Sequence, residues 1–255
     1  MADPRKDAFA TTSKTIIKNL ERAGMEGYFC ETSADARELV KSLVPEGSSI
    51  AWGGTETFKE TGVKEMLEAG AYTMFDRAKA TTPEEQRAVY LQHFDSDFFF
   101  MSANALTLKG ELVNIDGNSN RVACLSFGPK HVIVLVGMNK IVKDTEEGLK
   151  RVRTMACPPN AARLHTGTPC ETVGICGMCH EPGCMCCNTV ITRHNRHAGR
   201  IKVILIAEDL GSKRKSRGHT LPAITYLPIA NQQSLLTIPG ISPKPRLPSP
   251  RAVSP

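Results

Sequence analysis

The residues best suited to chemistry in this chain are six cysteines that fall within eighteen residues. They are Cys170, Cys176, Cys179, Cys184, Cys186 and Cys187. Thiolates so close in sequence usually converge on a metal ion, because a C-x2-C step such as Cys176 to Cys179 lets two sulfurs reach one ion from a single turn. The full spacing is C-x5-C-x2-C-x6-C if Cys186 is the last ligand and ends in x7 if Cys187 is, and the spacing alone leaves both open.

An iron–sulfur cluster, a structural zinc ion and adventitious thiols are three competing explanations for these cysteines. Zinc ribbons and knuckles usually bring two C-x2-C pairs, and this chain has one, which favours an iron–sulfur cluster over zinc. Either metal centre needs four ligands, so at least two of the six thiols are spare, and Cys184 is the weakest candidate. Cys30, Cys124 and Cys157 lie in or beside apolar segments, where we expect inert, buried thiols.

A second candidate is the loop 52–57, Trp-Gly-Gly-Thr-Glu-Thr, which lies between a predicted strand and a predicted helix. Gly53 and Gly54 allow close approach to the backbone, and the amides of a helix N-terminus attract anions. A phosphate, a carboxylate or a nucleotide-like ligand would fit there. Two glycines alone are weak evidence, and a tight turn with Thr55 or Thr57 capping the helix explains this loop better by itself.

Two further loops carry polar side chains that could meet the first loop. Ser102 and Asn104 follow a buried strand, at the end where open α/β sheets usually bind ligands. Residues 114–121 carry more polar side chains than a turn needs, although a turn explains them most simply. We predict that the three loops form one polar crevice for a small anionic ligand. Its wall residues are then Gly53, Gly54, Thr55, Ser102, Asn104, Asp116, Asn118 and Asn120.

Strands and helices alternate through much of the chain. The apolar patterns predict helices at 5–24, 33–43, 57–69 and 144–155 and one that begins at Pro83. They predict strands at 27–30, 48–52, 72–75, 97–101, 131–136, 190–192 and 201–208. Such alternation with short connections predicts an open, largely parallel sheet flanked by helices. The continuous apolar run 131–136 is typical of a strand covered on both faces.

The pattern changes in the middle of the chain. Short strands are predicted at 105–108, 111–115 and 122–126, separated by turn residues, which indicates a β-hairpin or meander inserted in the α/β domain. Ser33 is predicted to cap the helix that it begins. The cysteines lie in a predicted loop at 166–188.

The net charge of the whole chain is a poor guide to its binding partners. The chain carries +6, but residues 212–255 hold seven Lys or Arg and no Asp or Glu, which leaves about −1 for residues 1–211. We therefore expect no nucleic-acid partner. Residues 212–255 also hold eight of the sixteen prolines, so we predict a disordered, basic, proline-rich tail that is extra to a domain at 1–211.

The sequence indicates neither a membrane span nor a secretory route. The longest apolar runs, 132–136 and 203–207, are too short to cross a bilayer, and the charged first twenty residues hold no apolar signal core. We expect a cytoplasmic protein. Its thiols would meet a reducing environment, in which they persist or bind metal rather than form structural disulfides.

Several blocks of this sequence resemble the LUD-domain (lactate-utilisation, DUF162) family, and most closely its short, stand-alone bacterial branch. They are WGGTET at 52–57, SANALT at 102–107, GELVNIDGNSNRVA at 110–123, FGPK at 127–130 and VGMNKIV at 136–142. The resemblance covers roughly residues 5–211. It extends to Cys170, Cys176, Cys179 and a final Cys-Asn at 187–188, and it therefore favours Cys187 over Cys186 as the fourth ligand. Members usually end near an Glu-Asp-Leu-Gly such as 208–211.

The resemblance implies a fold similar to CoA transferases and ribose-phosphate isomerases, and a link to the oxidation of L-lactate to pyruvate through iron–sulfur proteins. We therefore expect a protein that binds a small anionic metabolite, carries an iron–sulfur cluster and meets redox partners of a lactate-oxidation complex. Two alternatives stand. One is a transferase or isomerase for a phosphorylated or CoA-linked small molecule, with structural zinc, and the other is a non-catalytic subunit that docks on a partner. No catalytic residue is assigned, and the oligomeric state, a homo-oligomer included, is open.

Overall fold

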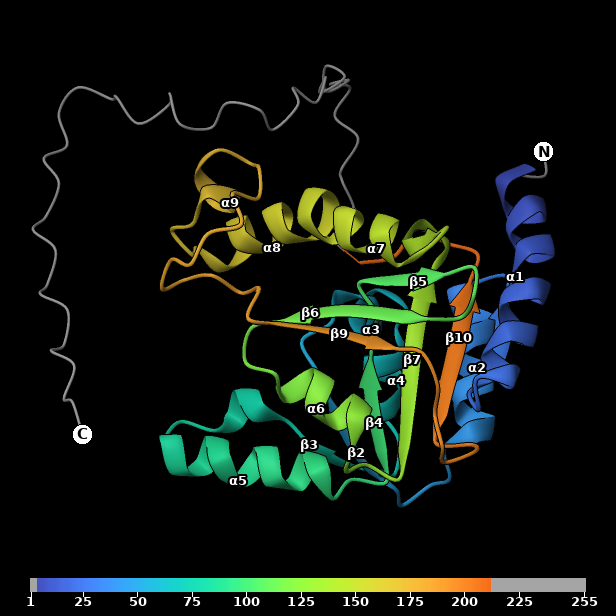
Figure 1. The fold of residues 1–255 in the computed structure, drawn as a ribbon. Coiled ribbons are helices and arrows are strands. Elements are labelled where there is room, and N and C mark those ends of the chain that lie inside the picture. The colour runs from blue at the N-terminus through green and yellow to red at the C-terminus, as the bar shows by residue number, and fades with distance from the viewer. Residues whose placement is uncertain (1–3, 212–255) are drawn as a thin grey trace, which may run out of the picture. The chain divides into compact units, whose positions relative to one another are not determined.

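A six-stranded sheet forms the centre of the computed structural model, which describes residues 4–211 (Figure 1). Its strands are β1 (Glu26–Cys30), β2 (Ser49–Trp52), β3 (Thr73–Phe75), β4 (Phe98–Met101), β7 (His131–Gly137) and β10 (Ile201–Ile206). Their order is β1-β10-β7-β4-β2-β3, and every neighbouring pair is parallel. The predicted open, parallel α/β sheet is therefore confirmed.

Helices cover both faces of this sheet. One face carries α1 (Pro4–Arg22), α5 (Pro83–Phe94) and α6 (Asn120–Ser126). The other carries α2 (Ser33–Leu43), α3 (Glu56–Glu60) and α4 (Val63–Glu68). Along β4, Phe99 enters the first core, and Phe98 and Phe100 enter the second, because successive strand side chains point to opposite faces. This double burial explains why residues 132–136 of β7 are all apolar.

Local sequence signals predict most of the helices, but α2 and the helix predicted at 57–69 differ in detail. Thr32, not Ser33, caps α2: its hydroxyl accepts from the Asp35 amide, and the Asp35 carboxylate accepts from the Thr32 amide. The helix predicted at 57–69 is split into α3 and α4, because Gly62 between them has φ +70° and interrupts the helical path.

A second, four-stranded sheet replaces the simple hairpin predicted for the middle of the chain. Its order is β8-β5-β6-β9, with β5 (Ala105–Thr107), β6 (Leu112–Asp116), β8 (Ile141–Val142) and β9 (Asn188–Thr192). The strands β5 and β6 form the expected antiparallel hairpin. The strand predicted at 122–126 is wrong, since this segment lies in α6. Val122 and Leu125 are buried there at helical spacing, and so short an apolar run fits either structure.

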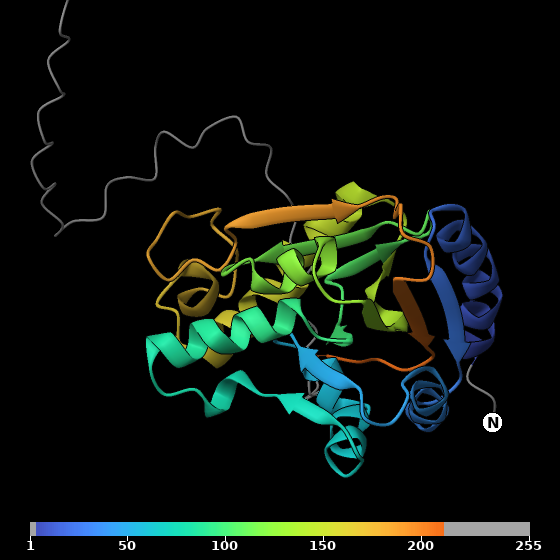
Figure 2. The same ribbon diagram turned by 90° about the horizontal axis from the view of Figure 1, so that it is seen from below.

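The helix predicted at 144–155 is longer than expected. It begins as α7 (Thr145–Arg151), passes through a π-helical turn (Val152–Ala156) and continues as α8 (Cys157–Leu164). Within the cysteine-rich segment 166–188, the short helix α9 (Pro169–Thr172) packs against α8 (Figure 1). At the opposite side of the domain, α1 lies along β1 (Figures 1 and 2).

No helix within residues 4–211 has both the length and the hydropathy needed to cross a membrane. The predicted tail at 212–255 lies outside the described residues.

Two glycines in left-handed conformation provide a matched test of the packing around α1. Gly24 has φ +72°, and a Cβ there would lie 2.1 Å from the Asn195 carbonyl oxygen, whereas Gly47 has φ +84° and open space around it. Both Ala variants incur the left-handed backbone cost of about 1–2 kcal/mol, and only Gly24→Ala adds a backbone clash. Urea unfolding should show that Gly24→Ala lowers the free energy of unfolding by at least roughly 1 kcal/mol more than Gly47→Ala does. Equal losses would contradict this packing.

Candidate functional site

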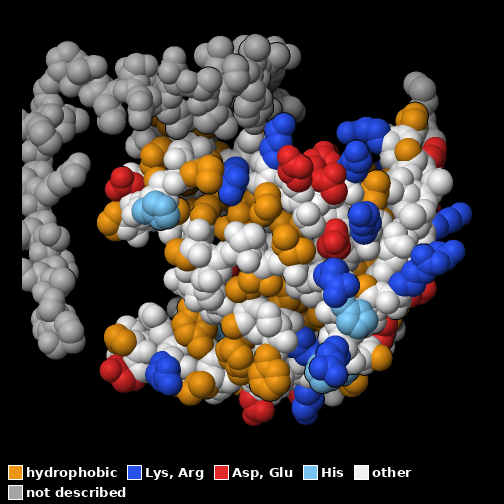
Figure 3. Space-filling model, in the orientation of Figure 1, with side chains coloured by type: hydrophobic (Ala, Val, Ile, Leu, Met, Phe, Trp, Pro, Cys, Tyr) orange, Lys and Arg blue, Asp and Glu red, His pale blue; other side chains and the backbone are white. Residues whose placement is uncertain are grey.

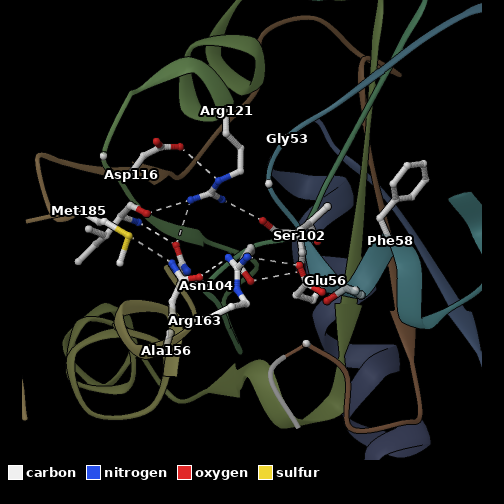
Figure 4. Close-up of a pocket in the computed structure, with 18 of the residues that line it drawn as sticks. Gly53, Glu56, Phe58, Ser102, Asn104, Asp116, Arg121, Ala156, Arg163 and Met185 are labelled. Carbon is white, nitrogen blue, oxygen red and sulfur yellow. Dashed lines mark hydrogen bonds and ion pairs between the residues drawn. The ribbon is translucent and has the colours of Figure 1, made fainter. Parts of the chain in front are cut away.

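A cavity of about 1060 Å³ lies at the carboxyl ends of β2 and β4 (Figure 4). Residues that follow these strands and β6 form one side of it, and the continuous helix α7–α8 forms another. This is the end of a parallel sheet at which α/β proteins commonly bind ligands.

The structure places all eight predicted wall residues around this one cavity. They are Gly53, Gly54, Thr55, Ser102, Asn104, Asp116, Asn118 and Asn120. Thr55 Oγ1 and Asn120 Nδ2 are buried atoms with no hydrogen-bond partner among the described residues, and such atoms in a native cavity call for a partner. The role of the eight residues in ligand binding stays a prediction.

Arg121, which the sequence interpretation did not single out, holds the cavity wall together. Its guanidinium is buried and donates to the carbonyl oxygens of Ser102 (3.0 Å) and Ile115 (2.9 Å). It also donates to the side-chain oxygens of Asn114 (2.5 Å) and Asn104 (3.2 Å). Its Nε lies 3.2 Å from a carboxylate oxygen of Asp116 (Figure 4). One side chain thus fixes the loop after β4 and the end of β6 against α6.

A glycine is needed at position 53 for a structural reason that differs from the predicted one. A Cβ at this position would lie 2.8 Å from Cγ of Arg121, so the absence of a side chain lets the β2 loop pack directly on the Arg121 stem. The side-chain oxygen of Asn104 is likewise bonded within the wall, because it also accepts from the Ile115 amide at 2.9 Å. Several of the predicted ligand residues therefore build the wall as well as line it.

Lys140 is a second residue that the sequence interpretation did not single out. It follows β7, lines the cavity and is 7% exposed. Its Nζ donates to Ser102 Oγ at 2.7 Å and to Thr57 Oγ1 at 2.8 Å. Burial, together with the positive charges of Arg151 and Arg121, lowers the pKa of Lys140 to about 7, although Glu60 opposes the shift. Near neutral pH this amine is partly uncharged.

Basic side chains predominate around the cavity. Seven basic and four acidic residues line it. The basic residues are Lys59, Lys64, Arg77, Arg121, Lys140, Arg151 and Arg163. An excess of basic residues in a recess favours an anionic ligand. On the molecular face shown in Figure 3, basic and acidic side chains both occur.

The cysteine-rich segment forms part of the same wall. Cys157 and Cys170 are buried in a small core with Val152 of the π-helical turn, and Cys176 and Cys186 pack against that core. Cys157, expected to be an inert thiol away from the cluster, has its sulfur 3.4 Å from that of Cys186. Both of these residues line the cavity.

The four predicted metal ligands are not gathered as one set. The Cys170 thiol lies near that of Cys176, and burial and this neighbour raise its pKa to about 11. Cys187 is exposed, and its thiol donates to the Cys184 carbonyl at 3.5 Å. Within residues 4–211, no three or more His, Cys, Asp or Glu side chains are grouped as they would be around a metal ion. The ligand set Cys170, Cys176, Cys179 and Cys187 stays a prediction. Its soft sulfur donors are chemically suited to iron–sulfur clusters and to zinc.

Cys30 and Cys124 lie apart from this cluster, in the cores of the parallel sheet. Burial raises their thiol pKa values to about 11 and about 12, so both stay protonated and unreactive at neutral pH.

Replacing Lys140 by Met should stabilise the protein most at low pH. The amine has its ordinary pKa of 10.5 in the unfolded chain and one of about 7 when folded. Below pH 7 the folded protein bears the full cost of a buried charge, and this cost fades as the pH rises from 7 to 10.5. Lys140→Met should raise the unfolding free energy by roughly 2–4 kcal/mol at pH 6 and by little at pH 10.

Urea unfolding at both pH values measures this difference. Lys59→Met is the matched control, because Lys59 lines the same cavity but is half exposed. A stabilisation that does not change with pH would show that the charge of Lys140 is not its cause.

Several solved structures are similar to this chain at low sequence identity. A crystal structure of a DUF162 family protein from Deinococcus radiodurans is similar over 78% of this chain and 98% of its own, with 14% identity and a TM-score of 0.46. The beta subunit of eIF2B from Chaetomium thermophilum matches 45% of this chain and 44% of its own, with 12% identity and a TM-score of 0.33. The delta subunit matches 46% and 50%, with 14% identity and a TM-score of 0.32.

No curated protein matches the chain significantly. The family model of the LUD domain, however, matches residues 13–206, a range that runs from α1 to the end of β10 and includes every strand of both sheets. The chain therefore belongs to the LUD-domain family.

Proposed function

We propose that this LUD-domain protein binds a small anionic metabolite in the cavity at the strand ends. The observation that carries the proposal is the cavity itself, with seven basic residues against four acidic ones and with buried polar atoms that lack partners. Given the family, a component of L-lactate oxidation to pyruvate, or of a related redox pathway, is the role that we infer. Both compounds are small carboxylates of the kind that this positive cavity favours.

We further propose that Cys170, Cys176, Cys179 and Cys187 hold an iron–sulfur cluster. Such a cluster would supply one-electron transfer when bound. Two neighbouring thiols, those of Cys157 and Cys186, already line the cavity, so the proposed redox centre and the bound metabolite would share a wall. A redox protein partner would then exchange electrons with the cluster.

Carboxylate binding can be tested by calorimetry and thermal shift with L-lactate, pyruvate and the neutral amide lactamide. We expect lactate or pyruvate to bind and to raise the melting temperature, and lactamide to have no effect. Arg77→Gln should weaken binding by about tenfold or more, because it removes a charged donor from the cavity. Lys41→Gln on the exposed face of α2 is the control and should leave affinity unchanged. Equal binding of lactamide would rule out an anion site.

The metal is tested by anaerobic purification with an absorption spectrum and with iron, sulfide and zinc analysis. We expect matched iron and sulfide, both lost in a Cys176→Ser, Cys179→Ser double variant. A Cys30→Ala, Cys124→Ala variant is the matched control and should keep them, because those thiols lie in other cores. Zinc alone would favour the transferase or isomerase alternative with structural zinc. Metal retained in the double serine variant would refute the ligand assignment.

A further inference from the structure

Lys140 has an environment that a lysine with only a structural role does not need. Its Nζ is buried, and both of its hydrogen bonds go to hydroxyl oxygens, those of Ser102 and Thr57. Among residues 4–211, no carboxylate lies within ion-pair distance of it. The nearby Glu60 carboxylate accepts from the Gly211 amide at 2.6 Å. A buried ammonium without a counter-ion is costly, whereas a neutral amine with two hydroxyl acceptors is well accommodated.

The charged groups around Lys140 point to the kind of ligand that it meets. Arg151 on α7 and Arg121 on α6 disfavour a positive charge at Nζ, while Glu60 on α3 favours it less strongly. The guanidinium groups of both arginines are fixed by backbone carbonyls, so their charges stay beside the cavity. The same positive field that releases the lysine proton attracts a carboxylate.

A 2-oxo acid satisfies both features at once, since its carboxylate suits the positive field and its adjacent carbonyl suits a neutral amine. We propose that Lys140 is a nucleophile that forms a covalent imine with the carbonyl carbon of a small 2-oxo acid bound in the cavity. This inference rests on the proposed anion site and adds a reacting atom and a substrate class to it. Lysine amines activated by burial and by neighbouring cations form such adducts with carbonyl substrates.

The reaction balances without an external oxidant or reductant. The Nζ lone pair attacks the carbonyl carbon, and the electrons of the carbon–oxygen π bond move to oxygen. The oxygen takes up one of the two protons of the attacking nitrogen and becomes the hydroxyl of a carbinolamine. The nitrogen then gives up its remaining proton as that hydroxyl leaves as water, and a carbon–nitrogen double bond forms. The hydroxyls of Ser102 and Thr57, which already bond Nζ, hold the nitrogen in place while its protons move.

Reductive trapping tests the proposal on the full chain. The protein is incubated with pyruvate or glyoxylate and sodium cyanoborohydride, and intact and peptide masses are recorded. We expect one reduced adduct per chain, on the peptide that holds Lys140. Its formation should rise with pH and be half-maximal near pH 7, the pKa of this amine, whereas exposed lysines react only at higher pH. The adduct should be absent in Lys140→Met and unchanged in Lys41→Met, because Lys41 is exposed on α2 and does not line the cavity.

A parallel thermal-shift titration with pyruvate tests the anion site separately from the lysine nucleophile. Stabilisation without an adduct on Lys140 would overturn the nucleophile and leave the anion site standing. An adduct spread over surface lysines, and retained in Lys140→Met, would also overturn it. Neither stabilisation nor adduct with either oxo acid would overturn the nucleophile and count against the anion site as well. Because Lys140→Met is expected to be more stable than the parent protein, loss of its adduct would not reflect unfolding.

Discussion

The Arg121 guanidinium is the interaction on which the geometry of the cavity depends. It is buried, and its donors are directed at oxygens of two segments of the chain, the loop after β4 and the strand β6. A buried cation is tolerated when each donor has a partner and a carboxylate such as Asp116 lies beside it. A lysine could not replace it, because a single ammonium cannot reach several fixed acceptors at the angles of a planar fork. One side chain thus joins the loop after β4 to the end of β6, in addition to the hydrogen bonds that β6 makes with β9.

The positive charge of Arg121 also affects Lys140. Arg121 and Arg151 make the region positive, and Lys140 must be buried within it. The buried charge of Lys140 costs stability, and proteins usually keep such local instability where a site needs it. The positive charges of Arg121 and Arg151 destabilise a protonated lysine and attract an anion. The cost in stability and the capacity to bind an anion therefore have the same origin.

The sequence reveals the strands and the wall of the cavity better than its charged centre. The strand at 131–136 was predictable as covered on both faces because its residues 132–136 are all apolar. The loops after β2 and β4 were predictable as neighbours because parallel strands end at one edge of a sheet. The segment 122–126 was misjudged because its apolar residues fit a strand as well as a helix turn. Arg121 and Lys140 were not predicted, because no local sequence pattern marks a charged residue as buried. The partners of the buried Lys140 amine, Thr57 and Ser102, lie far from it in the sequence. Both residues do lie inside the blocks that resemble the LUD family, which was the one signal that could have drawn attention to them.

The helix α7–α8 explains how the thiols come to share a wall with the cavity. Val152, Ala156, Asn160 and Arg163 recur every three or four residues along it and all line the cavity, so one face of a continuous helix spans that wall. Arg151, at the end of α7, donates to the Asn104 and Asn139 carbonyls and anchors this helix to the loops of both sheets. Cys157 begins α8 on the far side of the π-helical turn and contacts Cys186 from the cysteine-rich segment. One continuous helix therefore connects the cysteine-rich segment, through Cys157, with the segment before Lys140, through the bond from Arg151 to the Asn139 carbonyl.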